Sequence, residues 1–269
     1  MGEGRPVDEH VYESGANIAD HQRFVTASAD DGQTFGTIYA VDSSDYPSGG
    51  LPSGTIAAAN GVLAVAYTAA AAPRATCPCV IFETSTDHGA TFDRHVVPTV
   101  NAASIPRPFI TADPNVPGHF ALTILDATGT QNQVYATRDG GSTWHGPALV
   151  GEAPANPRFK PWISFGPSGQ IALVWRTLHG TSVATDPYDV WAAVGRDQGY
   201  HGVVFSAPVL VSSASASYPP GSNGQGDDFS FVLVDHKYIH VGWGDSRSGL
   251  TETWYGRVAL STMTGPPSS

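Results

Sequence analysis

Basic and acidic side chains lie beside short apolar stretches of the chain. The basic ones are suited to binding an acidic ligand. Arg107, Arg176 and Arg247 occupy such positions, together with Lys160. A guanidinium group binds a carboxylate through two parallel hydrogen bonds, so these residues predict a binding site for a carboxylate-bearing ligand. Asp228 precedes a further apolar stretch and completes the predicted binding set. Each residue also has a structural alternative, an ion pair or a turn cap.

Four other side chains could supply acid–base or nucleophilic chemistry. Glycoside hydrolysis uses two carboxylates on either side of the scissile bond, and Asp126, Asp228 or Asp245 could provide them. Glu252 and Tyr255 lie three residues apart and add a further carboxylate and a phenol to the catalytic candidates. The alternative for Asp245 is a purely structural pairing with Arg247.

The elements that must position these residues are revealed by a recurring eight-residue pattern. It occurs as Ser28–Phe35 (SADDGQTF), Ser85–Phe92 (STDHGATF) and Thr137–Trp144 (TRDGGSTW), and a fourth copy keeps only an aspartate and a glycine. Successive aspartates lie 57, 52 and 58 residues apart, a period typical of repeat architectures. The positions predicted to be structural are Asp30, Gly32, Phe35, Asp87, Gly89, Phe92, Asp139, Gly141, Trp144, Asp197 and Gly199.

The residue types of the pattern predict a self-capped turn between two strands. Aspartate accepts hydrogen bonds from nearby backbone amides, glycine tolerates positive φ, and a preceding serine or threonine adds another side-chain bond. The aromatic residue that ends the pattern is a large apolar group suited to packing. A metal site is the weaker interpretation, because each turn offers one carboxylate where Ca²⁺ takes several oxygens. No metal or other cofactor is therefore expected.

The pattern resembles the Asp-box of the sialidase (neuraminidase)-like BNR-repeat β-propellers. The resemblance implies an all-β chain of four-stranded antiparallel blades, with each box at the turn between the third and fourth strands, opposite the usual active site. About five blade units are visible, at residues 1–45, 46–100, 101–153, 154–213 and 214–261. They predict one propeller domain over residues 1–265, followed by a tail at 266–269.

The ends of the repeat array are incomplete. The first unit lacks an obvious inner strand and the last lacks a box and a clear outer strand. Either five blades form a ring in which both termini share a blade, or the chain is a six-bladed, sialidase-like ring without its N-terminal part. The missing first strand and the absence of an N-terminal apolar segment favour the second explanation.

The resemblance covers the motif that defines the fold but not the motif that carries the family's catalysis. Sialidases of this family use three arginines for the substrate carboxylate, a tyrosine assisted by a glutamate, and an acid/base aspartate. Their Arg-Ile-Pro motif is missing, and Ile105-Pro106-Arg107-Pro108 has the letters in another order. The sequence therefore predicts a propeller that binds an acidic glycan or a protein through its arginine-bearing face. The alternatives are an exo-sialidase that releases terminal sialic acid and a structural module of a larger secreted protein.

The composition of the chain argues against some classes of binding partner. The net charge is −11, which argues against nucleic acid and anionic membrane surfaces as partners. No apolar stretch is long enough to insert into a bilayer. The family resemblance implies an extracellular location. The chain is expected to be a monomer or a part of a larger chain. Cys77 and Cys79 are expected to be unpaired, since an extended strand would hold them in poor geometry for a disulfide.

Overall fold

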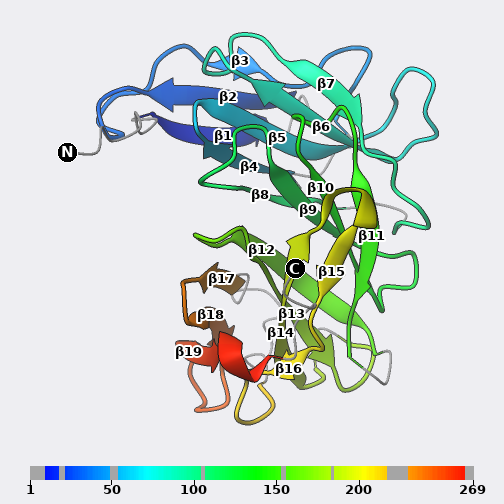
Figure 1. Cartoon of the computed structure of the whole chain (residues 1–269), viewed down its shortest axis with the longest axis vertical. Helices are drawn as coiled ribbons and strands as arrows, with labels where there is room; N and C mark the ends of the chain where they lie inside the picture. Colours follow the sequence, from blue (N-terminus) through cyan, green and yellow to red (C-terminus); the bar gives the residue numbers. More distant parts are fainter. Residues whose placement is uncertain are drawn as a thin grey trace. The chain divides into compact units, whose positions relative to one another are not determined.

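The chain is all-β. A computed structural model describes residues 10–17, 22–48, 54–103, 107–152, 156–182, 185–216 and 230–263. Within these ranges the secondary structure consists of nineteen strands and two short 3₁₀ helices, η1 (Gly199–His201) and η2 (Leu260–Thr262) (Figure 1). No helix in the described ranges is long and apolar enough to cross a membrane.

The strands form five antiparallel sheets, numbered here in chain order. Sheet 1 contains β1 (Val11–Asn17), β2 (Gln22–Ser28) and β3 (Tyr39–Ala40). Sheet 2 contains β4 (Gly54–Ala59), β5 (Val62–Ala69), β6 (Cys79–Ser85) and β7 (Asp93–Val96). Sheet 3 contains β8 (Phe109–Ala112), β9 (Phe120–Leu125), β10 (Asn132–Thr137) and β11 (His145–Val150).

The last two sheets follow the same order of antiparallel neighbours. Sheet 4 contains β12 (Arg158–Phe165), β13 (Ile171–Leu178), β14 (Tyr188–Asp197), β15 (Val203–Phe205) and β16 (Val209–Leu210). Sheet 5 contains β17 (Ser230–Val234), β18 (Tyr238–Asp245) and β19 (Glu252–Ala259). The predicted all-β class and the blade-like order of strands are confirmed, and in the described residues the first and last sheets have three strands each.

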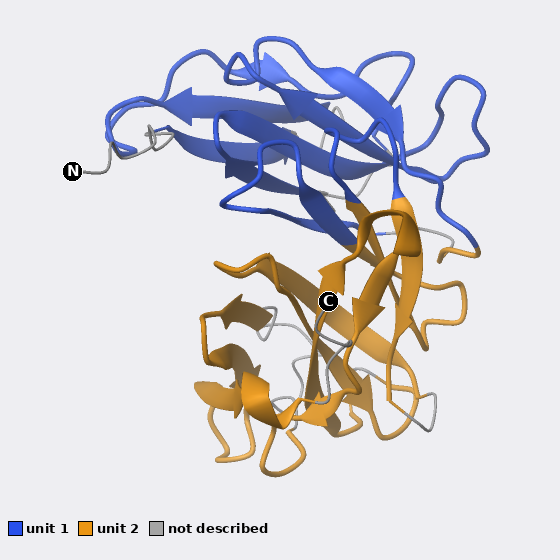
Figure 2. Ribbon diagram, viewed as in Figure 1, with its two compact units in different colours: residues 1–100, 104–122, 137–144 blue, residues 101–103, 123–136, 145–269 orange. Residues whose placement is uncertain are grey.

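The chain divides into two compact units (Figure 2). Unit 1 takes residues 1–100, 104–122 and 137–144, and unit 2 takes residues 101–103, 123–136 and 145–269. The core of unit 1 includes Val25, Leu63 and Ile81 from sheets 1 and 2. The core of unit 2 includes Val174 and Val241 from sheets 4 and 5. Apolar burial between sheets is thus the main stabilising term within each unit.

The three intact boxes close their turns in the same way. In the first, Asp30 accepts hydrogen bonds from the backbone amide of Thr34 (2.8 Å), from the Thr34 hydroxyl (2.6 Å) and from the Ser28 hydroxyl (2.7 Å). Bonds from Thr34 and Ser28 hold the pKa of Asp30 at about 2. Asp87 repeats this set with Thr91 and Ser85, and its pKa is also lowered to about 2.

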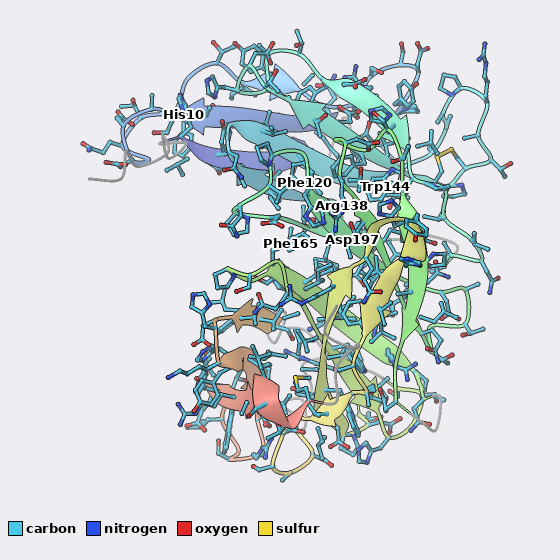
Figure 3. The ribbon with its side chains drawn as sticks, viewed as in Figure 1. His10, Phe120, Arg138, Trp144, Phe165 and Asp197 are labelled. Carbon is cyan, nitrogen blue, oxygen red and sulfur yellow. A yellow bond between two sulfur atoms is a disulfide. The ribbon has the colours of Figure 1, made fainter. Side chains whose placement is uncertain are left out.

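The third box adds packing to this pattern. Asp139 accepts from the amide (2.8 Å) and hydroxyl (2.7 Å) of Thr143. The ring centres of Trp144 and of Phe82 in β6 lie 5.1 Å apart in an edge-on contact, and Phe82 also contacts Phe120 edge-on. Trp144 and Phe120 are labelled in Figure 3. The corresponding aromatic of the first box, Phe35, is 41% exposed, so it is not a buried anchor.

The two cysteines are joined by a disulfide, so the prediction of unpaired thiols is wrong. Cys79 begins β6, but Cys77 lies in the preceding loop. Their Cα atoms are 4.3 Å apart, whereas two residues along an extended strand would be separated by roughly 6.6 Å. The bend before β6 brings the sulfur atoms together, and the assumption of an extended strand caused the error.

Candidate functional site

Loops at one end of sheets 4 and 5, both in unit 2, bring several predicted residues together. The β13–β14 and β18–β19 connections lie at this end. The Tyr188 hydroxyl at the start of β14 donates a hydrogen bond to the carbonyl of Gly244 near the end of β18 (2.5 Å). We call Arg176, Tyr188, Asp245, Arg247 and Trp254 the loop-end cluster.

Arg247 is held from two sides within this cluster. Its Nε donates to Asp245 Oδ2 at 2.5 Å, and its backbone amide donates to Asp245 Oδ1 at 2.9 Å. Its guanidinium carbon lies 4.4 Å from the centre of the Trp254 ring, a cation–π contact. Asp245 is fully buried, while the Arg247 side chain keeps 17% of its surface exposed. The guanidinium is therefore fixed and still reaches solvent.

Arg176 occupies a different environment. It is fully buried, and its Nε donates to the Ser230 hydroxyl at 3.0 Å. Its guanidinium lies 4.9 Å from the centre of the Tyr188 ring and 5.9 Å from that of Phe159. These contacts link sheet 4 to sheet 5, so Arg176 supports the cluster from beneath and does not reach the surface.

The entry to β12 contains a second ion pair. Arg158 and Glu152 approach within 3.2 Å, and Glu152 also accepts from Trp175 Nε1 at 2.8 Å. Lys160 lies two residues further on, at an irregularity of the β12–β13 register, with a φ of 49° and a half-buried side chain. The paired Arg158 is therefore structural, and the binding role of Lys160 stays a prediction.

Two predicted binding residues lie outside unit 2 or outside the described ranges. Arg107 is an exposed residue of unit 1 just before β8. Asp228 lies outside the described residues. Within unit 2 the structure brings Arg176 and Arg247 of the predicted arginine triad into one cluster.

Asp126 serves its own turn. Its Oδ1 accepts from the amides of Thr130 (2.9 Å) and Gln131 (3.0 Å), and its Oδ2 accepts from the Thr128 hydroxyl (2.7 Å). Burial acts to raise the pKa of Asp126, but these hydrogen bonds outweigh it and hold the pKa below its usual value. The carboxylate is therefore ionised at neutral pH and poorly suited to donate a proton.

Glu252 and Tyr255 are not brought together. In the β18–β19 register Glu252 lies opposite Asp245 and Tyr255 opposite Gly242. Because successive side chains of a strand alternate between faces, residues three apart point to opposite sides of the sheet. Glu252 accepts from the Ser248 hydroxyl at 2.7 Å, and Tyr255 bonds to His240. The catalytic roles of Asp126, Asp245, Glu252 and Tyr255 stay predictions.

A buried cluster in unit 1 was missed by sequence reasoning. Glu83 Oε1 accepts hydrogen bonds from the Tyr67 hydroxyl (2.9 Å) and from Arg94 Nε (2.8 Å). Burial raises the pKa of Glu83 to about 7, against the opposing effect of Arg94. The three residues lie on neighbouring strands, so only the exact strand register could have revealed the contact. Tyr67 and Glu83 are fully buried, and the cluster is a structural one.

Comparison with known proteins places the fold. No protein-family model matches the chain. A stretch of 92 residues is 42% identical to an FMN-dependent NADH:quinone oxidoreductase of Nitratidesulfovibrio vulgaris, in strains DP4 and Hildenborough alike. The overlap covers 32% of this chain and 41% of those relatives. It leaves out most of both proteins, so the activity named for them is not carried over.

Solved structures match over most of the chain. The Hadza microbial sialidase Hz136 matches 90% of this chain and 45% of its own, with a TM-score of 0.51 and 17% identity. An intramolecular trans-sialidase from Ruminococcus gnavus matches 91% of this chain and 52% of its own, with a TM-score of 0.51 and 14% identity. The chain spans about half the length of these sialidases. Together with the five antiparallel sheets, these matches show a sialidase-like β-propeller fold.

Proposed function

We propose that this protein binds glycans that carry an acidic sugar, and that Arg247 of the loop-end cluster receives the sugar carboxylate. The observation that carries the proposal is the fixed, partly exposed guanidinium of Arg247 between Asp245 and Trp254. An arginine locked by a buried carboxylate and an aromatic ring loses little side-chain entropy when it binds a ligand.

The guanidinium retains free binding capacity. Asp245 Oδ2 engages the Nε and Nη2 side of Arg247, and Trp254 covers one face. Among the described residues none accepts a hydrogen bond from Nη1, so this edge can bind a carboxylate oxygen. Because the protein carries a net charge of −11, an acidic ligand needs such a local cation to overcome repulsion at longer range.

The structural neighbours support the same ligand class. Both are named as sialidases, and the Ruminococcus gnavus protein was solved with oseltamivir carboxylate, a ligand that bears a carboxylate. At 14% and 17% identity these matches concern the fold, so the ligand remains our proposal.

The test compares binding of a methyl sialoside and a neutral methyl galactoside by isothermal titration calorimetry. We expect binding of the sialoside alone, and a loss of about tenfold or more in Arg247→Ala, since a charge-assisted hydrogen bond contributes about 1.5–3 kcal/mol. The matched control is Arg196→Ala, an exposed arginine at the opposite end of sheet 4, which should bind normally. Equal binding of both sugars, or unchanged affinity in Arg247→Ala, would contradict the proposal.

Hydrolysis of a terminal sialic acid is the second candidate, supported by the sialidase-like fold. A fluorogenic sialoside measures it directly. Turnover by the wild type that is lost in Arg247→Ala would establish a hydrolase acting at the loop-end cluster. Binding without turnover would leave the glycan-binding function alone.

A further inference from the structure

Asp235, His240 and Tyr255 form a hydrogen-bonded chain on sheet 5. His240 Nε2 lies 2.9 Å from Asp235 Oδ2, and His240 Nδ1 lies 2.6 Å from the Tyr255 hydroxyl. Asp235 comes from the β17–β18 turn, His240 from β18 and Tyr255 from β19. All three reach the surface: Tyr255 is 58% exposed, and the side chains of Asp235 and His240 are 51% and 27% exposed.

The direction of these hydrogen bonds follows from Asp235. Its pKa is lowered to about 2 by the bond from His240 and by the backbone amides of Lys237 and Tyr238. An ionised carboxylate only accepts hydrogen bonds, so the proton shared with Asp235 sits on Nε2 of His240. Nδ1 of the neutral imidazole then has a free lone pair, and the Tyr255 hydroxyl donates to it. The arrangement directs the phenolic proton toward a base.

An apolar surface adjoins the phenol. In the sheet register Gly242 lies between Phe231 of β17 and Tyr255 of β19. A Cβ atom at Gly242 would lie 2.0 Å from the Phe231 ring, so the missing side chain lets that ring lie flat across the central strand. Phe231 and Leu233 are 41% and 59% exposed. A planar or apolar group could rest on this surface beside the Tyr255 oxygen.

We propose that Tyr255 is a nucleophilic tyrosine that takes an acyl group from an aryl ester, with His240 as its general base and Asp235 as the residue that positions the imidazole. The phenolic oxygen attacks the ester carbonyl carbon while its proton moves to His240 Nδ1. A new carbon–oxygen bond forms, the bond to the aryl oxygen breaks, and the aryloxide leaves with the electron pair. The imidazolium returns its proton to the aryloxide, so the products are acyl-Tyr255 and a free phenol.

Tyr200 provides an internal control. It is 89% exposed, more than Tyr255, and its ring lies against that of His201 in a tilted contact, with 3.8 Å between ring centres. Within the described ranges its hydroxyl donates to no imidazole. If exposure alone decided reactivity, Tyr200 would react faster than Tyr255.

The experiment treats the whole protein with p-nitrophenyl acetate and maps acetylated tyrosines by peptide mass spectrometry. We expect Tyr255 to be acetylated about 10²-fold faster than Tyr200, the lower range of general-base effects. Tyr255→Phe, which keeps the ring, should remove the fast release of nitrophenolate, and His240→Gln should slow acetylation of Tyr255 to the rate of Tyr200. Equal rates at Tyr255 and Tyr200 in the wild type would overturn the proposal.

A pH profile separates base catalysis from a structural role. The groups facing His240 are Asp235, Tyr238 and Tyr255, with Arg257 stacked on Tyr238. We expect the acetylation rate of Tyr255 to depend on pH in the wild type, because only an imidazole with a free Nδ1 lone pair can accept the phenolic proton. Asp235→Asn should slow the reaction at neutral pH, because the amide no longer fixes one tautomer. A pH profile that is the same in wild type, Asp235→Asn and His240→Gln would contradict the role of both residues.

Discussion

The aspartate of the Asp-box motif has different partners in the three intact turns and in the fourth turn, which keeps only the aspartate and the glycine of the motif. Asp30, Asp87 and Asp139 bond to hydroxyls and amides within four residues of themselves. Asp197, labelled in Figure 3, bonds to His145, which lies 52 residues earlier in the chain, at 3.0 Å. The carboxylate of an intact turn is bonded by local partners, whereas that of the fourth turn is also bonded to a residue on a distant strand.

The sequence explains this difference. In the fourth turn Gly195 stands where the others have serine or threonine, and His201 stands where they have threonine. Asp197 therefore lacks the two hydroxyls that engage the other carboxylates, and it accepts a local hydrogen bond from the backbone amide of Gly199 at 2.9 Å. Losing local partners leaves the carboxylate available for a long-range one. The aspartate of an incomplete motif can thus form a long-range structural contact in place of the local hydroxyl bonds.

The largest expected effect concerns the turn glycines. Gly141 has a φ of +102°, and an added Cβ would lie 2.7 Å from the Phe82 ring and 3.0 Å from His95. Gly199 has a φ of +64° and nothing within 4 Å of the same position. Gly141→Ala should therefore destabilise the protein by about 3 kcal/mol, from strain plus overpacking, and Gly199→Ala by about 1 kcal/mol, from strain alone.

Chemical denaturation of both variants measures these free energies of unfolding. Similar losses of stability in Gly141→Ala and Gly199→Ala would show that packing on Phe82 does not restrict position 141. That result would contradict the predicted difference between the intact and the fourth turn.

The next effect concerns the long-range pair. The Asp197 side chain is buried, so Asp197→Ala should lower the free energy of unfolding by about 2 kcal/mol through the loss of its contact with His145. A double-mutant cycle with His145→Ala should show strong coupling between the two sites. Additive losses would mean that the contact contributes nothing to stability.

Buried Glu83 and the exposed box residue Asp87 should give opposite dependences of protein stability on pH. Its folded pKa of about 7 exceeds its usual value of 4.5, so between these values the folded protein keeps a proton that the unfolded chain releases. Stability should therefore fall as pH rises from about 4.5 to about 7, by at most about 1.4 kcal/mol per pH unit. Glu83→Gln, which imitates the protonated group, should lack this decline. Parallel melting-temperature curves for wild type and variant across this range would refute it.

The smallest expected effect concerns Asp87, whose contribution to stability falls as the pH is lowered. Asp87 has a lowered pKa of about 2, so its contribution to stability is present above the unfolded value near 3.8 and is lost as pH falls through about 2. Its carboxylate is exposed, so the change will be small. Asp87→Asn should flatten the melting-temperature curve only in strong acid, and an effect at neutral pH alone would be unexpected.

Features encoded in short stretches could be predicted from the sequence. The box pattern and its period predicted an all-β chain of blade-like antiparallel units, because turn chemistry is local.

The contacts of the site depend on register and could not be predicted. Nothing near Tyr255 indicates that His240 rather than Glu252 is its neighbour, because that follows from the β18–β19 pairing. The burial of Arg176 depends on sheet 5 covering it through Ser230, a contact that spans 54 residues. The bend that joins Cys77 to Cys79 likewise has no signal in the residue spacing.

The central claim is that an acidic sugar binds at the loop-end cluster beside Arg247 and Trp254. The most direct test is titration with a sialoside while the indole N–H resonances of the tryptophans are followed by NMR. We predict that the Trp254 resonance shifts progressively, while that of Trp144, in the third Asp-box turn, stays unchanged. No shift at Trp254 at saturating sialoside, or an equal shift at Trp144, would contradict the claim.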